Sequence, residues 1–163
     1  MSAGQQKASG AIWTNGIDET VVSVYCRRIG FRHITQGNEH SVKLKKVPYD
    51  FSICKVTDIS HIDLSADFCF VGKTDEELSL VCREEDAPKE AARRDDGWRA
   101  FRVEGELDFS LIGILSAIST ALAEARIGLF AISTYNTDYI LVKREHFERA
   151  MDALRKAGFE AEG

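Results

Sequence analysis

A run of polar side chains between two apolar segments is the part of this sequence best suited to chemistry. Ile127–Ile132 and Tyr139–Val142 read as strands buried on both faces, and the polar stretch Ser133–Asp138 lies between them. This stretch combines hydroxyl groups, an amide and a carboxylate, all of which exchange hydrogen bonds with a ligand or with water. It is therefore either a solvated turn or part of a small-molecule site.

Catalytic and metal chemistry find little support elsewhere. His61 lies in a polar loop and His146 heads a helix, and neither accompanies a nucleophile elbow, a metal-ligand spacing or a phosphate-binding glycine loop. The cysteines form no Cys-x-x-Cys unit, and three of them lie in apolar strand-like segments, which favours reduced, buried side chains; they are Cys26, Cys54, Cys69 and Cys82. We therefore expect no enzyme activity, no metal and no cofactor.

Composition narrows the class of protein further. The chain has 163 residues, 44% apolar and 29% charged, which is ordinary for a soluble globular protein. A net charge of -5 argues against binding to nucleic acid or to an anionic membrane, because both partners reward clustered Lys and Arg. No segment approaches the ~20 apolar residues that span a bilayer, and the N-terminus lacks the apolar core of a secretion signal, so a cytoplasmic location is expected.

The elements that must position the polar stretch follow from hydrophobic periodicity. We expect strands at 51–56, 68–71, 78–82 and 98–103, a linker at 83–96, and helices at 111–125 and 146–157. Ser110 is the expected N-cap of the first helix, and Gly158 the stop of the second. From Trp98 onward the order is βαββα, one strand short of a ferredoxin-like βαββαβ unit, so the first half of the chain is expected to cover the open sheet edge.

Three stretches together resemble the ACT-like regulatory domains, which sense amino acids, and in particular a stand-alone bacterial branch with two tandem units. They are Thr74–Cys82, Gly97–Gly105 and Ser133–Val142. The last also resembles a signature in the cytosolic arginine sensor of animal cells. The resemblance implies an α+β fold of ferredoxin-like βαββαβ units in tandem, with antiparallel sheets and helices on one face. It divides the chain into an extension of unclear role (1–46), a first, reduced unit with a linker (47–96) and a second, more complete unit (97–163).

The resemblance also implies where a ligand would lie. In ACT-like folds it sits at an interface between paired units, near the loop from the first strand into the first helix, here Glu104–Gly113. A helix start offers unpaired N–H groups to an α-carboxylate, and Asp138 is the expected acceptor for the ammonium group. Gly113 would cost ~1 kcal/mol inside a helix, which either a close ligand approach or tight helix packing would explain. The implied ligand-binding residues are Asp108, Phe109, Ser110, Ile112, Gly113, Ile114, Ser133, Thr134, Tyr135, Asn136 and Asp138.

The function that the resemblance implies is that of a non-catalytic regulatory module which binds a free amino acid between ACT-like units. A homodimer and a regulated partner protein are the expected partners. The alternative is a constitutive interaction or oligomerisation module that has lost ligand binding. Asn136 also remains open to a simple turn-forming role, because Asn and Asp are common in turns.

Overall fold

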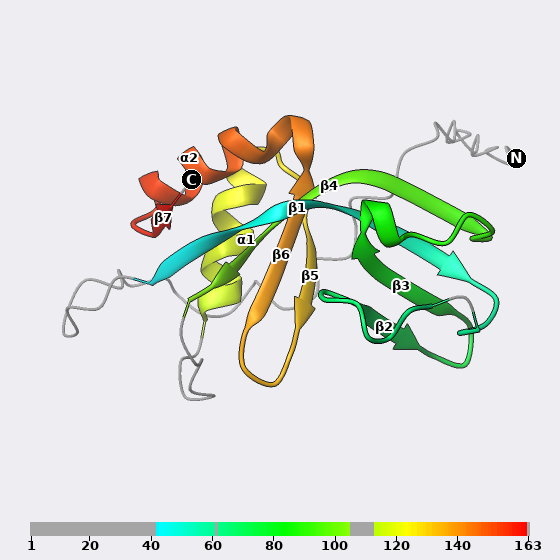
Figure 1. The fold of residues 1–163 in the computed structure, drawn as a ribbon. Coiled ribbons are helices and arrows are strands. Elements are labelled where there is room, and N and C mark those ends of the chain that lie inside the picture. The colour runs from blue at the N-terminus through cyan, green and yellow to red at the C-terminus, as the bar shows by residue number, and fades with distance from the viewer. Residues whose placement is uncertain (1–41, 61, 105–112, 163) are drawn as a thin grey trace, which may run out of the picture. The chain divides into compact units, whose positions relative to one another are not determined.

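The computed structural model describes residues 42–60, 62–104 and 113–162, which Figure 1 shows as coloured ribbons. No helix among these residues is both long and apolar enough to cross a membrane. In chain order the elements are β1 (Lys43–Val56), β2 (Phe70–Lys73), β3 (Leu78–Arg83), the 3-10 helix η2 (Glu84–Asp86), β4 (Arg93–Val103), α1 (Ile114–Glu124), β5 (Phe130–Ser133), β6 (Asp138–Lys143), the 3-10 helix η3 (Arg144–His146), α2 (Phe147–Lys156) and β7 (Glu160–Glu162).

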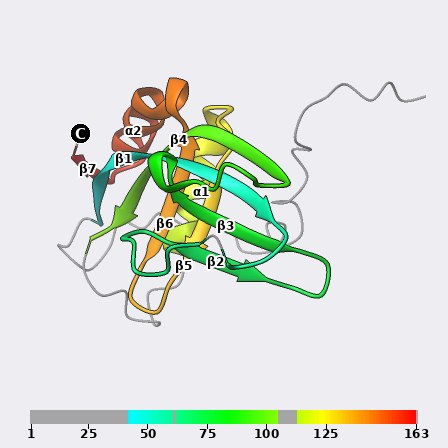
Figure 2. The same cartoon turned by 45° about the vertical axis from the view of Figure 1, so that its right-hand side comes forward.

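The strands form one sheet in the order β2-β3-β1-β4-β6-β5, with β7 added in parallel beside the start of β1. All other pairings are antiparallel. The long strands β1 and β4 cross the middle of the sheet, and Phe51 of β1 lies opposite Trp98 of β4. On one side, β2 and β3 extend the sheet from the end of β1 (Figure 2); on the other, β6 and β5 extend it from the end of β4.

The two sides of the sheet share a pattern. The hairpins β2–β3 and β5–β6 begin at Phe70 and Phe130, sixty residues apart, and β3 and β6 have the same order of half-buried and buried positions. The registers agree as well. Lys55, one residue before the end of β1, faces Ser79, and Arg102, one residue before the end of β4, faces Tyr139, sixty residues after Ser79. We call the described residues of 50–92 the first half, and the described residues of 93–162 the second half.

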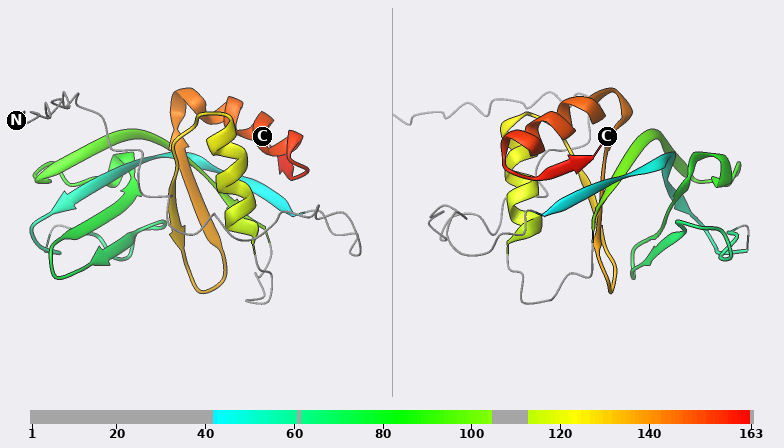
Figure 3. Two further views of the ribbon diagram at one scale, coloured as in Figure 1. Left: turned by 180° about the vertical axis from the view of Figure 1, so that it is seen from behind. Right: turned by 60° about the vertical axis from the view of Figure 1, so that its left-hand side comes forward.

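Among the described residues, α-helices cover only the second half of the sheet. Side chains from α1 and α2 pack against β4, β6 and the start of β1, and both helices lie on the same side of these strands (Figure 3). The inward positions of α2 recur every three or four residues and are at most 1% exposed; they are Phe147, Ala150, Met151 and Leu154. Gly158 follows with φ of +96°, a backbone conformation that suits glycine, and ends the helix as expected.

The two halves pack against each other through the face of the sheet that lies opposite α1 and α2. One apolar cluster joins Phe51 and Val81 of the first half to Trp98 and Leu141 of the second. The rings of Phe70 and Tyr139 lie 5.1 Å apart across this contact. A separate cluster on the outer face of the first half lies under loop segments rather than helices; its buried members are Cys54, Val56, Leu80, Cys82 and Ala87. The two halves therefore share an apolar core.

Several boundaries differ from the sequence-based expectations. The second half is not one strand short, because β7 follows α2 and pairs with β1. The expected linker ends early, since its last residues already belong to β4, which begins at Arg93. The helix α1 begins at Ile114 and not at Leu111, with Gly113 rather than Ser110 as its N-cap residue. The strand β1 begins at Lys43, inside the range that we assigned to the N-terminal extension.

Candidate ligand site

The polar stretch between β5 and β6 forms a closed hairpin turn. The Thr134 N–H donates to the Thr137 carbonyl at 2.9 Å, and the Thr134 hydroxyl donates to the same carbonyl at 2.7 Å. The Thr137 N–H approaches the Thr134 hydroxyl oxygen at 3.3 Å. The Thr134 hydroxyl therefore closes the turn, so a turn-forming role accounts for its polarity without a ligand.

Thr137, which the sequence did not single out, anchors this hairpin to the neighbouring strand. Its side chain is 8% exposed, and its hydroxyl donates to the backbone carbonyl of Val103 at 2.7 Å. Val103 is the last residue of β4, so the bond brings the polar hairpin to the start of the segment 104–113. In sequence Thr137 is one hydroxyl among several, and only its burial distinguishes it.

The other polar residues of the hairpin stay near solvent. Ser133 and Asn136 are exposed, and Asp138 is half-buried and pairs with Ser133 across the hairpin. Tyr135 is 84% exposed, so its ring walls no cavity formed by the described part of the chain. The hairpin thus presents a carboxylate and an amide to a molecule arriving from outside.

The helix start contributes differently from what the sequence indicated. Gly113 has φ of +97° at the N-cap, and a Cβ placed on it would meet no described atom within 4 Å. Gly113 is therefore not a helix-interior residue, and its left-handed backbone, rather than tight packing against a described residue, accounts for the glycine. Ile114 is half-buried against the core. Asp108, Phe109, Ser110 and Ile112 lie outside the described residues.

The end of β4, the start of α1 and the β5–β6 hairpin lie at the same end of the second half (Figure 1). The antiparallel pairing of β4 with β6 requires this, because β6 starts at the hairpin where β4 ends. The structure therefore brings together the two stretches that the sequence proposed as one site, so far as they are described. No group of three or more His, Cys, Asp or Glu among the described residues is placed to hold a metal ion.

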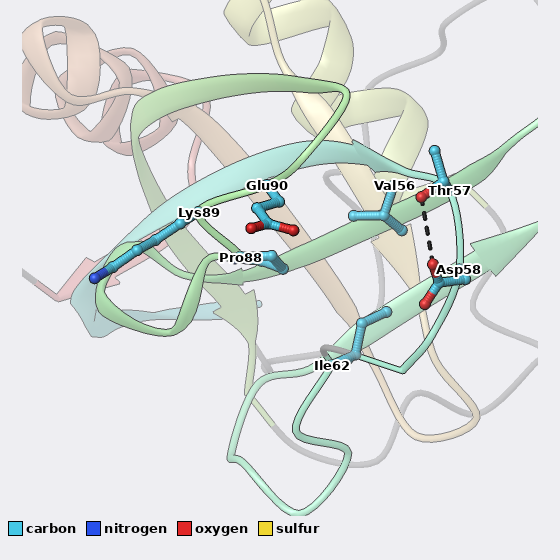
Figure 4. Close-up of a pocket in the computed structure, with 7 residues that line it drawn as sticks. All are labelled: Val56, Thr57, Asp58, Ile62, Pro88, Lys89 and Glu90. Atoms are coloured by element: carbon cyan, nitrogen blue, oxygen red, sulfur yellow. Dashed lines mark hydrogen bonds between the residues drawn. The ribbon is translucent and has the colours of Figure 1, made fainter.

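A hollow of about 290 Å³ occupies the corresponding place after β1 in the first half (Figure 4). Val56, Ile62 and Pro88 supply its apolar wall, and the Glu90 carboxylate points toward them while Lys89 extends away. The Asp58 carboxylate accepts a hydrogen bond from the Ser60 N–H at 2.8 Å. By the register given above, Val56 corresponds to Val103, so the hollow follows β1 as the segment 104–113 follows β4.

Ion pairs tie the two halves together near the middle of the sheet. Asp50 of β1 lies 3.3 Å from Arg99 of β4 and 2.9 Å from Arg144 of η3. Asp96 accepts hydrogen bonds from the Arg94 Nε at 2.6 Å and from the Ser52 hydroxyl at 2.5 Å. These two bonds, the one from Arg94 foremost, hold the pKa of Asp96 below its ordinary value. Movement of one half against the other would have to break such contacts.

Comparison with known proteins agrees with this architecture. Residues 93–156, from β4 to the end of α2, match the ACT domain family. The search of curated proteins finds no match. The crystal structure of protein Atu0741 from Agobacterium tumefaciens is similar, with a TM-score of 0.68 and 29% identity over 76% of this chain and 93% of that one.

Two further structures extend the comparison. VC0802 from Vibrio cholerae, described as a protein of unknown function and possible transport protein, gives a TM-score of 0.57 and 25% identity over 72% of this chain and 91% of that one. The ligand-free regulatory subunit of aspartate kinase from Thermus thermophilus gives 0.54 and 10% identity over 72% and 97%, which shows a shared fold alone. Residues 93–156 thus match the ACT domain family, and the described part of the chain has an ACT-like α+β fold, an antiparallel sheet with two helices.

Proposed function

We propose that this chain is a non-catalytic regulatory module that binds a free amino acid at an interface between two ACT-like units. The match of residues 93–156 to the ACT domain family supports the class of module. The fold is shared with the regulatory subunit of an aspartate kinase, and also with part of the aspartate kinase of Clostridium acetobutylicum, described as an allosteric enzyme. Binding without chemistry regulates when the ligand favours one arrangement of the units over another.

The observation that carries the proposal is the hydrogen bond from Thr137 to Val103, which holds the polar hairpin beside the end of β4. A ligand lying there has the first turn of α1 at the same end of the sheet, and the N–H groups of a first turn, which have no partner within their own helix, suit an α-carboxylate. The Asp138 carboxylate is the proposed acceptor for the α-ammonium group, because a charge-assisted hydrogen bond is the stronger kind. Ser133, Thr134 and Asn136 are proposed to add neutral hydrogen bonds.

The tandem arrangement is part of the proposal. The equal spacing of the two hairpins and the matching registers support a common origin for the two halves. In the first half, loop segments stand where α1 and α2 stand in the second, which is what a reduced unit would look like. The apolar contact between the halves and the ion pairs of Asp50 would then transmit the effect of the ligand.

A screen of the twenty proteinogenic amino acids by thermal shift tests the function. A ligand that binds only the folded chain adds about 2.7 kcal/mol at 100 times its dissociation constant, so at least one amino acid at millimolar concentration should raise the Tm. Calorimetry on the same samples should record heat for that amino acid alone. If all twenty leave the Tm unchanged and give no heat, the alternative, a constitutive interaction module, takes the place of this proposal.

The sequence offers a matched pair of variants that separates site from scaffold. Thr74 closes the β2–β3 turn as Thr134 closes the β5–β6 turn, accepting from the Glu77 N–H at 3.0 Å. Thr134→Ala and Thr74→Ala should therefore lower the Tm by similar amounts, whereas only Thr134→Ala should weaken binding of the amino acid found in the screen. Equal binding by both variants would remove the hairpin from the site.

The proposed homodimer has its own test. A sheet whose outer strands β2 and β5 have unpaired edges within the described chain offers a surface for a second copy. Light scattering at rising concentration should show a mass twice that of the 18.2 kDa chain. A constant monomer mass would eliminate the dimer and leave the ligand site between the two halves of a single chain. A regulated partner protein is proposed as the receiver of the signal.

A further inference from the structure

Three thiols lie on one outer face of the first half. Cys54 belongs to β1 and Cys82 to β3, and both are buried at 3% exposure or less. Cys69 directly precedes β2 and is half-buried against the same apolar cluster. All three are free cysteines. The first half therefore carries two thiols on the neighbouring strands β3 and β1 and a third just before β2, the strand beside β3.

The register places two of these thiols opposite each other. Phe70 of β2 and Val81 of β3 form the last pair of an antiparallel ladder, so continuing the register by one residue sets Cys69, which precedes β2, opposite Cys82. Residues directly opposite in such a ladder have Cα atoms roughly 4.5–5.5 Å apart, inside the ~4.4–6.8 Å range of disulfides. Both side chains pack into one cluster and so lie on one face of the sheet.

Cys54 is placed less favourably toward Cys82. It pairs with Leu80, two residues before Cys82, and Ser52 is the residue that faces Cys82. Cys54 and Cys82 are therefore diagonal neighbours, whose separation is typically about 7–8 Å and too long for a bridge without backbone movement. The geometry thus selects one pair out of the three described thiols.

We propose that Cys69 and Cys82 form a reversible cross-strand disulfide by exchange with a low-molecular-weight disulfide such as oxidised glutathione. The Cys69 thiolate attacks one sulfur of glutathione disulfide, forming a mixed disulfide and releasing one glutathione thiolate. The Cys82 thiolate then attacks the Cys69 sulfur and releases the second glutathione. The two protein thiols lose two electrons and two protons in total, and the glutathione disulfide gains both.

Exposure decides the order of the two steps. Burial raises the pKa of Cys82 to about 12, so this thiol is a poor first nucleophile at neutral pH. Cys69 directly precedes β2, the outermost strand on its side of the sheet; burial also raises the pKa of Cys69, but this thiol is the more accessible of the two. Once Cys69 holds the mixed disulfide, the facing position of Cys82 supplies the high local concentration that a weak nucleophile needs. The rate should rise with pH, because both steps use thiolates.

The bridge would act on the hollow of the first half. Cys69 ends the loop that carries Ile62, and both residues pack against the cluster formed by Cys54, Val56, Leu80, Cys82 and Ala87. Val56 and Ile62 also line the hollow. Oxidation would fix the end of this loop to β3 and restrict the movement of its wall, whereas reduction would release it.

The test uses the full chain with Cys26→Ser, so that the three described thiols are the only ones present. The protein is incubated with oxidised glutathione at pH 8, the remaining thiols are alkylated after denaturation, and peptides are identified by mass spectrometry. We expect a Cys69–Cys82 bridge, alkylated Cys54, and a mass lower by two hydrogen atoms before alkylation. Dithiothreitol should restore both thiols, and the bridged form should have the higher Tm because the closed loop constrains the unfolded chain.

Matched variants identify the roles of the thiols. Cys82→Ala should stop at one glutathione on Cys69, Cys54→Ala should form the bridge as the parent does, and Cys69→Ala should form neither bridge nor adduct. Alkylation of both Cys69 and Cys82 in the incubated parent, or a bridge that includes Cys54, would overturn the proposal. The parent protein alone decides this, even if Cys82→Ala fails to fold.

Discussion

The buried hydroxyl of Thr137 offers the sharpest test of how the polar hairpin is held. Thr137→Val removes the bond that the hydroxyl donates to the Val103 carbonyl at 2.7 Å and keeps the volume of the side chain. The carbonyl then loses a partner at a site only 8% exposed. Leaving such a group unsatisfied costs about 1–3 kcal/mol, and the added methyl group returns at most ~0.8 kcal/mol.

The expected net loss is therefore roughly 1–2 kcal/mol, because water has little access to the gap. For a chain of this length, each kcal/mol lowers the Tm by about 2–4 °C, so a fall of about 2–8 °C is predicted. Urea denaturation gives the same quantity as a lower midpoint with an unchanged slope. The variant should also bind the amino-acid ligand less well, since the hairpin is no longer held beside β4.

A second pair of variants isolates the hydroxyl from the methyl group of Thr137. Thr137→Ser keeps the hydroxyl and Thr137→Ala removes it, while both lack the methyl group. The alanine variant should be less stable than the serine variant by an amount close to the stability difference between the valine variant and the wild type. The bond to Val103 does not hold the hairpin if Thr137→Val is at least as stable as the wild type and Thr137→Ala is at least as stable as Thr137→Ser.

Three further predictions concern the site, the helix start and pH. Asp138→Ala should weaken ligand binding by ~2 kcal/mol, measured by calorimetry, and barely change the ligand-free Tm. Ile140→Ala, at a position with 0% exposure, should lower the stability in urea by roughly 2–5 kcal/mol and leave the polar contacts to the ligand in place. If Asp138→Ala unfolds the protein, the carboxylate has a structural role. Gly113→Ala should lower stability by about 1–2 kcal/mol because φ is +97°. The control Gly128→Ala, where a Cβ meets no described atom within 4 Å, should leave stability nearly unchanged. Equal urea midpoints for the two variants would contradict the prediction. Because its pKa is lowered in the folded state, Asp96 contributes stability above the ordinary pKa of a carboxyl group, and this contribution disappears as the pH falls through the folded-state pKa. The stability advantage of the wild type over Asp96→Asn in urea should therefore shrink below pH ~4. A stability difference that stays constant from pH 7 to pH 3 would refute this prediction.

Elements with a local residue pattern could be predicted from the sequence alone. Phe51–Val56 and Leu78–Cys82 were predicted as strands because β-branched and aromatic residues are concentrated there, and the structure confirms both. The final helix was predicted from Phe147, Ala150, Met151 and Leu154, which recur at helical spacing and are all buried. In such cases neighbours in the chain carry the whole signal, since each residue is buried or exposed by the twist of its own element.

The sequence also indicated the polar hairpin, but not how it is held. The hydroxyls and carboxylate of Ser133–Asp138 were recognisable as an unusual polar run between apolar strands. That Thr134 closes the turn and Thr137 reaches Val103 depends on distances within and between strands. Composition cannot supply these, because the partner of Thr137 lies 34 residues away.

Features that depend on pairing between distant segments could not be predicted and became visible in the folded chain. The strand β7 has three residues and too little pattern of its own, and it exists because the start of β1 pairs with it. Gly113 looked like a helix-interior glycine because its left-handed φ leaves no mark on the residues around it. The proposed meeting of Cys69 with Cys82 depends on the pairing of Phe70 with Val81, a register that a one-residue slip would destroy. Hydrophobicity along the chain indicates which residues will be buried, whereas strand pairing determines which of them come into contact.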